Sequence, residues 1–162
     1  IIYSGTNGGY RGETDASGHY TGYDQLIRQQ EAMVNHLKKK EAYLVLGYHF
    51  NSSITGQRND TGETYDIHYW TEDYRTTMSN AFECHFLDLK TEGSKNGKKL
   101  LLETSVITSV NDMSPEDQNY ISNEEFPASF TDNPKYDVHP NEYGNRAIAI
   151  LIRERMKELG LL

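Results

Sequence analysis

Two short stretches of this sequence hold residue types that suit proton transfer and the binding of negative charge. Near the amino end, Asn7 stands in the glycine-rich turn "SGTNGG" after an apolar run at residues 1–4. Near the carboxyl end, His139 comes just before Asn141, which suits the N-cap of a long amphipathic helix, and Pro140 presets the backbone between them. An imidazole accepts and releases protons near neutral pH, and an amide N–H can donate to a negatively charged oxygen.

Each of these residues also has an ordinary structural explanation. His139 suits a surface histidine at a tight helix start, and Asn7 suits a turn in which asparagine is common. The choice between the two interpretations depends on the elements that position His139 and Asn7.

The apolar pattern predicts short strands that alternate with helices. Strands are expected at residues 1–4, 42–47 and 84–89, where apolar residues run as in strands buried on both faces. Helices are expected at about residues 23–39, across residues 70–83, after Ser114 as an N-cap, and at 142–158 with Gly160 as the stop. Residues 93–97 indicate a turn and residues 51–68 a long polar loop, and periodicity leaves residues 100–110 open between strand and helix.

Two of these helices show a clear apolar face. The expected faces are Leu26, Ile27, Met33, Val34 and Leu37 on the first helix and Ala147, Ile148, Leu151, Ile152 and Met156 on the last. Cys84, the only cysteine, is expected to be an inert core residue at strand spacing beside Phe86. The aromatic residues of the middle region suit either the core or stacking on sugar rings; they are Tyr48, Tyr65, Tyr69, Trp70 and Tyr74.

Alternating strands and helices predict a parallel sheet with helices on both faces. In such a sheet, ligands sit at the carboxyl ends of the strands. The loop that holds Asn7 follows the first strand, and the loop from His49 follows the second, so both open at that edge. A polar loop as long as the one expected at residues 51–68 is unusual in a compact domain, and such loops are usually functional.

Composition excludes several classes of partner. The 162 residues suit one domain with a sizeable core, and 16 cationic against 24 acidic side chains give a net charge of −8. This charge disfavours a nucleic acid or an anionic membrane surface as partner. No apolar run approaches the ~20 residues that a membrane helix needs.

The stretches "GTN" and "HPNEYG", in this order, resemble two sequence blocks of the SGNH (GDSL-like) hydrolase family. Gly5 and Asn7 match the family's Gly-x-Asn block, and His139, Asn141 and Gly144 match its histidine block. "YLVLGYHF", "HFLDL", "SPEDQNYI" and "FPASF" fall between them in the family's order. The resemblance covers essentially the whole chain. It implies an α/β fold, a three-layer flavodoxin-like parallel sheet with helices on both faces, and a single domain over residues 1–162.

The resemblance also implies roles for these residues. His139 would take the proton of a serine hydroxyl, which is a poor nucleophile without a base. The Asn7 amide and the Gly5 backbone N–H would donate to the oxyanion of the tetrahedral intermediate. An aspartate would accept from the other ring nitrogen of His139 and orient it.

The chain departs from the family's pattern at the nucleophile. In the family, a Gly-Asp-Ser block with the serine precedes the Gly-x-Asn block, and here only residues 1–4 precede it. Ser4, Ser105 and Ser109 do not match the nucleophile's setting. The resemblance therefore implies that the serine lies in an upstream remainder of the same protein, and that the fold is incomplete at its amino end.

A second departure concerns the acid. The family's Asp-x-x-His spacing falls on Tyr136, which cannot serve. We favour Asp137 because it is nearest to His139. Asp132, or no acid at all, is the alternative.

Two functions remain open from the sequence. The leading one is an SGNH-type serine esterase or acylhydrolase, for instance a carbohydrate O-deacetylase, with these 162 residues inactive by themselves. The alternative is a non-catalytic SGNH-like module that binds carbohydrate or has a structural part in a phage tail or cell-surface assembly. The displaced aspartate favours the module a little, and the complete setting of His139 favours the esterase.

Neither function calls for a cofactor. A metal site from His49, His68 and His85 with Asp66 or Glu72 is disfavoured, because no pair has ligand spacing on a shared element. The expected partners are an ester substrate, such as an acylated carbohydrate, and the amino-terminal remainder of the protein.

Overall fold

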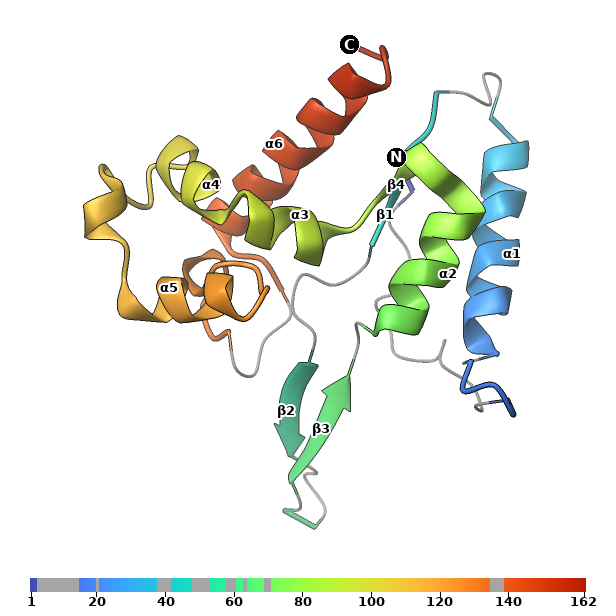
Figure 1. Ribbon diagram of the computed structural model, residues 1–162, viewed down its shortest axis with the longest axis horizontal. Coiled ribbons are helices and arrows are strands. Elements are labelled where there is room, and N and C mark those ends of the chain that lie inside the picture. Colours follow the sequence, from blue (N-terminus) through green and yellow to red (C-terminus); the bar gives the residue numbers. More distant parts are fainter. Residues whose placement is uncertain are drawn as a thin grey trace.

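The structure is a computed structural model that describes residues 1–2, 15–19, 21–37, 42–47, 53–57, 61–62, 64–68, 71–134 and 139–162, with only the backbone given for 53–57 and 64–68. The helices of these residues are α1 (Gly22–Asn35), α2 (Glu72–Phe82), α3 (Leu89–Lys95), α4 (Gly97–Glu103), α5 (Pro115–Ser122) and α6 (Glu142–Glu158). The strands are β1 (Val45–Leu46), β2 (Ser53–Gln57), β3 (Thr64–His68) and β4 (Phe86–Leu87). In Figure 1, β1 and β4 lie between α1 and α2 on one side and α3 and α6 on the other.

The central strands are parallel, as the sequence predicts. Val45 pairs with Phe86 and Leu46 with Leu87, and Ile2 forms a parallel bridge to Val45 on the other side of β1. Backbone bonds from Ile2 N to Leu44 O (2.7 Å) and from Leu46 N to Ile2 O (2.9 Å) hold that bridge. The described strands are shorter than predicted: β1 covers two residues of the range 42–47, and β4 follows a 3₁₀ turn at residues 83–85. Residues 3–4 of the first predicted strand lie outside the described residues.

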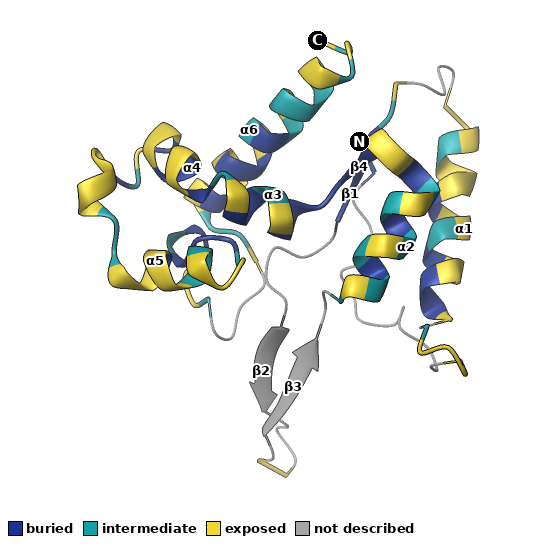
Figure 2. Ribbon diagram, viewed as in Figure 1, coloured by how far each residue is buried: buried dark blue, intermediate teal, exposed yellow. Residues whose placement is uncertain are grey.

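Both faces of these strands are buried, and successive residues serve opposite faces. Val45 and Phe86 join a core cluster with Tyr23 and Leu26 of α1 and Met78 of α2. The second cluster contains strand residues and residues from α3, α4 and α6; it includes Leu46, Leu87, Leu89, Leu100, Ala147 and Leu151. Figure 2 shows the buried stripes of these helices turned toward the strands. The predicted mixture of helices with parallel strands is confirmed for the described part of the chain.

Local sequence signals set several helix ends as predicted. Ser114 caps α5 by accepting from Asp117 N, with Pro115 in the first turn. Gly160 has φ +68°, so a residue without a Cβ stops α6. Residues 100–110, open from periodicity, begin as the end of α4.

The turn predicted at residues 93–97 is confined to Asn96, because Gly93 lies inside α3 and Gly97 begins α4. The reason is tertiary packing. A Cβ on Gly93 would come within 1.7 Å of Cδ2 of the buried Phe126 ring. This glycine is therefore a contact point between α3 and Phe126.

The long polar loop predicted at residues 51–68 contains an antiparallel hairpin instead. β2 and β3 pair from Ser53–His68 through Gln57–Thr64, and Gly62 in the connection has φ +70°. Figure 1 shows the hairpin projecting from the rest of the molecule. Gly62 ends the stretch "NDTG", whose residue types are typical of turns, but the strands around it carry few apolar residues and so were not predicted.

Three smaller predictions also need correction. α1 ends at Asn35 rather than near residue 39. Its last two residues, Val34 and Asn35, are weak helix formers. Met33 and Leu37 are exposed rather than part of its buried face. Cys84 is exposed, because it lies in the 3₁₀ turn before β4 and not in the strand.

The last helix agrees better with its prediction. Ala147, Ile148 and Leu151 are buried, and Ile152 packs against the same cluster. No described helix combines the length and the apolar character that crossing a membrane requires.

Candidate active site

His139 is exposed and stands two residues before the N-cap of α6. Asn141 is that cap, because its Oδ1 accepts from Gly144 N at 3.0 Å. Glu142 in the first turn suits the positive end of the helix. The local structure predicted for this stretch is thus confirmed.

Asn141 is also tied to the segment that precedes it. Its backbone N–H donates to Phe130 O at 2.9 Å, and its side-chain Nδ2 donates to Ser129 O at 3.1 Å. A further bond joins Nδ2 to Asp132 Oδ1 at 3.3 Å. The position of the chain two residues after His139 is therefore fixed by both its backbone and its side chain.

Gly144 allows this close approach. A Cβ at this position would lie 2.2 Å from Phe130 O and 2.9 Å from Pro140 Cβ. Backbone atoms cannot move aside as a flexible side chain can. A glycine is thus required for the first turn of α6 to pack on residues 128–131.

The direction of α6 places His139 relative to the sheet. Near the far end of the helix, Arg155 Nη1 donates to Cys84 O at 3.4 Å, just before β4 begins. The fourteen residues from Glu142 to Arg155 span about 20 Å of helix. α6 therefore runs back along the sheet, and its His139 end lies toward the carboxyl ends of the strands (Figure 1). This is the edge where α/β proteins bind ligands.

Three of the four predicted site residues lie outside the described part of the chain. These are Gly5, Asn7 and Asp137. Their convergence with His139 stays a prediction. Asp132, the alternative acid, is described, and its carboxylate accepts from Asn141.

Ser129, beside the Asn141 cap, and the two described serines considered as nucleophiles lie in different local settings. Ser129 Oγ donates to Asp117 at 2.7 Å. Ser109 caps a 3₁₀ turn by accepting from Asn111 N, and Ser105 follows α4 with φ +63°. That neither Ser105 nor Ser109 is the nucleophile stays a prediction.

A second histidine, which sequence analysis did not single out, lies in a cluster of carboxylates. His19 Nδ1 is 2.9 Å from Asp73 Oδ1, and Nε2 is 3.2 Å from Asp24 Oδ1. The bond with Asp73 raises the pKa of His19 above its usual value, partial burial opposes the shift, and Asp24 adds to it. His19 and Asp73 are 54 residues apart, so no local pattern indicates the contact.

Of the three histidines considered as metal ligands, His85 is the one whose side chain is described. His85 Nδ1 lies 3.0 Å from Tyr43 O, and its ring stacks on Tyr43. His49 and the side chain of His68 lie outside the described residues. Within the described part of the chain, no three histidine, cysteine or carboxylate residues are grouped as metal ligands.

Tyr74 is a core residue, because only 1% of it is exposed. It lies edge-on to Tyr23 and to Phe86. Of the two roles open for the aromatic residues of this region, Tyr74 therefore has the packing role. Tyr48, Tyr69, Trp70 and the side chain of Tyr65 lie outside the described residues.

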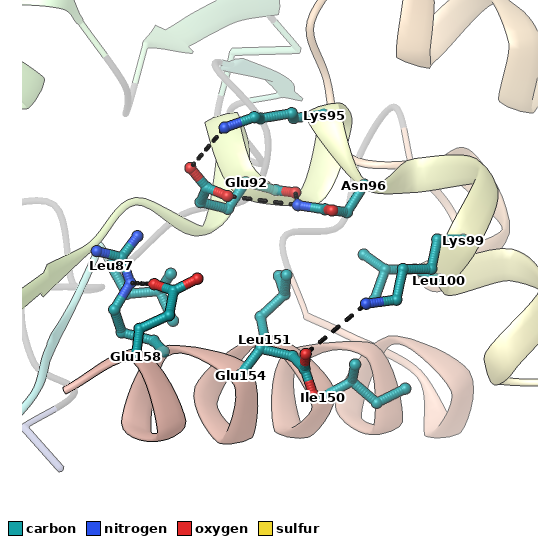
Figure 3. Close-up of a pocket in the computed structure, with 11 residues that line it drawn as sticks. Leu87, Glu92, Lys95, Asn96, Lys99, Leu100, Ile150, Leu151, Glu154 and Glu158 are labelled. Carbon is teal, nitrogen blue, oxygen red and sulfur yellow. Dashed lines mark hydrogen bonds and ion pairs between the residues drawn. The ribbon is translucent and has the colours of Figure 1, made fainter. Parts of the chain in front are cut away.

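A cavity of about 200 Å³ lies between α3 and the carboxyl-terminal half of α6. Figure 3 shows its charged rim, where Lys95 reaches toward Glu92 and Lys99 toward Glu154. Arg155 pairs with Glu158 at 3.2 Å, and Leu87, Leu100 and Leu151 line the interior. The acidic and basic side chains of the rim neutralise one another. On α6, the first residue that lines the cavity is Ile150, which lies well along the helix from His139.

Comparisons with protein-family models, with curated proteins and with solved structures give no match for this chain.

Proposed function

We propose that the chain is the carboxyl-terminal portion of an SGNH-type ester hydrolase with a three-layer parallel sheet. The observation that carries this proposal is the setting of His139. A histidine stands at the carboxyl edge of a parallel sheet, on the loop side of a helix whose cap, Asn141, is fixed by Phe130 O and Ser129 O. A general base needs such a held position.

The chemistry assigns a role to each predicted residue. His139 takes the proton of a serine supplied by the upstream remainder of the protein and returns it to the leaving alkoxide. Asn7 and the Gly5 N–H stabilise the oxyanion, and one such donor contributes about 10²–10³ in rate. Asp137 accepts from the second ring nitrogen of His139.

The substrate class is an ester, and an O-acetyl group on a carbohydrate is the substrate that we favour. The serine, its base and the oxyanion donors act at the acyl carbon of the ester, and this chemistry needs no metal or cofactor. The substrate's remaining groups would contact the loops at the carboxyl edge of the sheet.

Labelling by a serine-directed fluorophosphonate tests the proposal. The protein extended to include its upstream segment should be labelled, whereas the 162-residue chain alone should not, because the probe needs a serine activated by a base. His139→Ala should abolish labelling. His36→Ala, which changes an exposed histidine at the far end of α1, should leave it intact.

Two results would contradict the proposal. Labelling of the 162-residue chain at its own serines would show that the nucleophile is misplaced. Lack of labelling of the extended protein would favour the non-catalytic module that binds carbohydrate or serves in an assembly.

A further inference from the structure

The cap beside His139 depends on a buried carboxylate of another helix. Asp117 lies in the first turn of α5 and is only 1% exposed. Its Oδ1 accepts from Ser129 N at 2.9 Å. Its Oδ2 accepts from Ser129 Oγ at 2.7 Å and from Ser114 Oγ at 2.8 Å.

These bonds exceed what the cap of α5 requires. Ser114 Oγ already caps the helix by accepting from Asp117 N at 3.0 Å, and an acidic residue in a first turn interacts favourably with the helix dipole while exposed. Burial of a carboxylate is costly unless donors satisfy it. Asp117 meets this cost with donors from Ser129, twelve residues away, and so joins α5 to the turn at 128–130.

That turn is the same one that holds Asn141. Ser129 is bonded to Asp117 through its N–H and hydroxyl, and its carbonyl accepts from Asn141 Nδ2 at 3.1 Å. The next carbonyl, Phe130 O, accepts from Asn141 N at 2.9 Å. A continuous series of hydrogen bonds therefore runs from Asp117 through Ser129 to Asn141, two residues from His139.

We infer that Asp117 is a positioning residue for His139: it orients the two carbonyls at 129 and 130 that fix the Asn141 cap. Its effect on catalysis rests on the function proposed above, whereas its effect on the cap does not. The two effects can therefore be measured separately.

Amide hydrogen exchange in the 162-residue chain tests the effect on the cap. Asp117→Ala should speed exchange of the Gly144 amide, which is bonded to Asn141 Oδ1, about tenfold relative to the Leu151 amide in the middle of the same helix. Asp117→Asn, which keeps an acceptor for Ser129 N, should show a smaller change. Asp112→Ala removes a comparable acceptor, bonded to Thr108 Oγ1 in an exposed turn, and should leave the ratio unchanged.

A uniform change at Gly144 and Leu151 would overturn the inference, since it would mean only general destabilisation. An unchanged ratio would overturn it as well. If Asp117→Ala does not fold, Asp117→Asn and Ser129→Ala take its place, and Ser129→Ala should shift the ratio in the same direction by losing one bond to Asp117.

Ester hydrolysis by the extended protein tests the effect on His139. Asp117→Ala should lower kcat about 10–100-fold with KM within about twofold, because a misplaced base affects the chemical step more than substrate binding. Asp117→Asn should fall between this variant and the wild type. An unchanged kcat, or a change in KM alone, would overturn the link to His139. Inactive wild-type protein would refute the proposed function, while the exchange ratio would still decide whether Asp117 positions the cap.

Discussion

Two histidines precede helices that run back along the sheet, and they are held in opposite ways. His19, before α1, is half-buried and has a carboxylate against each ring nitrogen, Asp73 and Asp24. His139, before α6, is exposed, and the residue that anchors its segment, Asn141, is held mainly by the carbonyls of Ser129 and Phe130. One contact set favours the charged form of a ring, and the other fixes the position of the backbone.

The difference indicates what each histidine can do. A ring that donates to carboxylates from both nitrogens is stabilised as a cation, and a cation cannot accept a proton from a nucleophile. His19 therefore suits a structural link between α1 and α2. The contacts of Asn141 hold the backbone two residues after His139, and a general base needs such a held position.

The largest expected effect is on ester hydrolysis, and it distinguishes the roles of the two histidines. In the extended protein, His139→Ala should lower kcat/KM for an activated ester by about 10³-fold or more, because general-base catalysis is lost. His19→Ala should lower it by less than about tenfold, through a small displacement of α1. Comparable losses in both variants would mean that the contrast between the two histidines is wrong.

The next effect concerns the packing that holds the His139 segment. Gly144→Ala should destabilise the chain by about 2–3 kcal/mol in urea unfolding, because the added Cβ meets Phe130 O at 2.2 Å. Gly97→Ala is the matched control. There the nearest atoms are Cδ1 and Cγ1 of the Ile121 side chain, both at 2.8 Å, and no backbone atom is among the nearest three. A side chain can turn aside, so the loss should stay below about 1 kcal/mol.

If the two glycine variants lose the same stability, the first turn of α6 has more freedom than its contacts indicate. The fixed position of Asn141 would then no longer distinguish this end of the molecule from the His19 cluster.

Local signals in the sequence predicted the elements that carry His139. Asn141 as a cap, Gly160 as a stop and the buried face of α6 follow from residue types at helical spacing. The parallel pairing of Val45 with Phe86 follows from short apolar runs that alternate with helices. These features depend on nearby residues or on a general rule of chain connection.

The features that the sequence did not predict depend on distant partners. Gly93 looks like a turn residue until Phe126 is known to pack against it. His19 meets Asp73 across 54 residues, and Asp117 reaches Ser129 across twelve. Cys84 looks like a strand residue because the 3₁₀ turn before β4 has no distinctive pattern. Spacing alone carries no information on such contacts.

The smallest expected effect is the pH dependence of the His19 link. The bond with Asp73 raises the pKa of His19 above 6.5, partial burial opposes the shift, and Asp24 adds to it. The described titratable groups that face His19 include Asp15 in its own loop, Asp24 and the Tyr23 ring of α1, and Asp73 of α2. Hydrogen bonds from Ser17 lower the pKa of Asp15, so this carboxylate also stays charged near neutral pH.

The sign of the effect follows from the direction of the shift. Because the folded state binds the His19 proton more tightly than the unfolded state, its contribution is complete below pH 6.5 and is lost as the pH rises through the raised pKa. The free energy of unfolding of wild type minus that of His19→Gln should therefore shrink as the pH rises above 6.5, by less than about 1 kcal/mol for a partly exposed pair. His36→Gln, measured in parallel, corrects for changes that any exposed histidine would cause. A difference that stays constant with pH would show that His19 is not held as a cation, and the charge contrast with His139 would lose its basis.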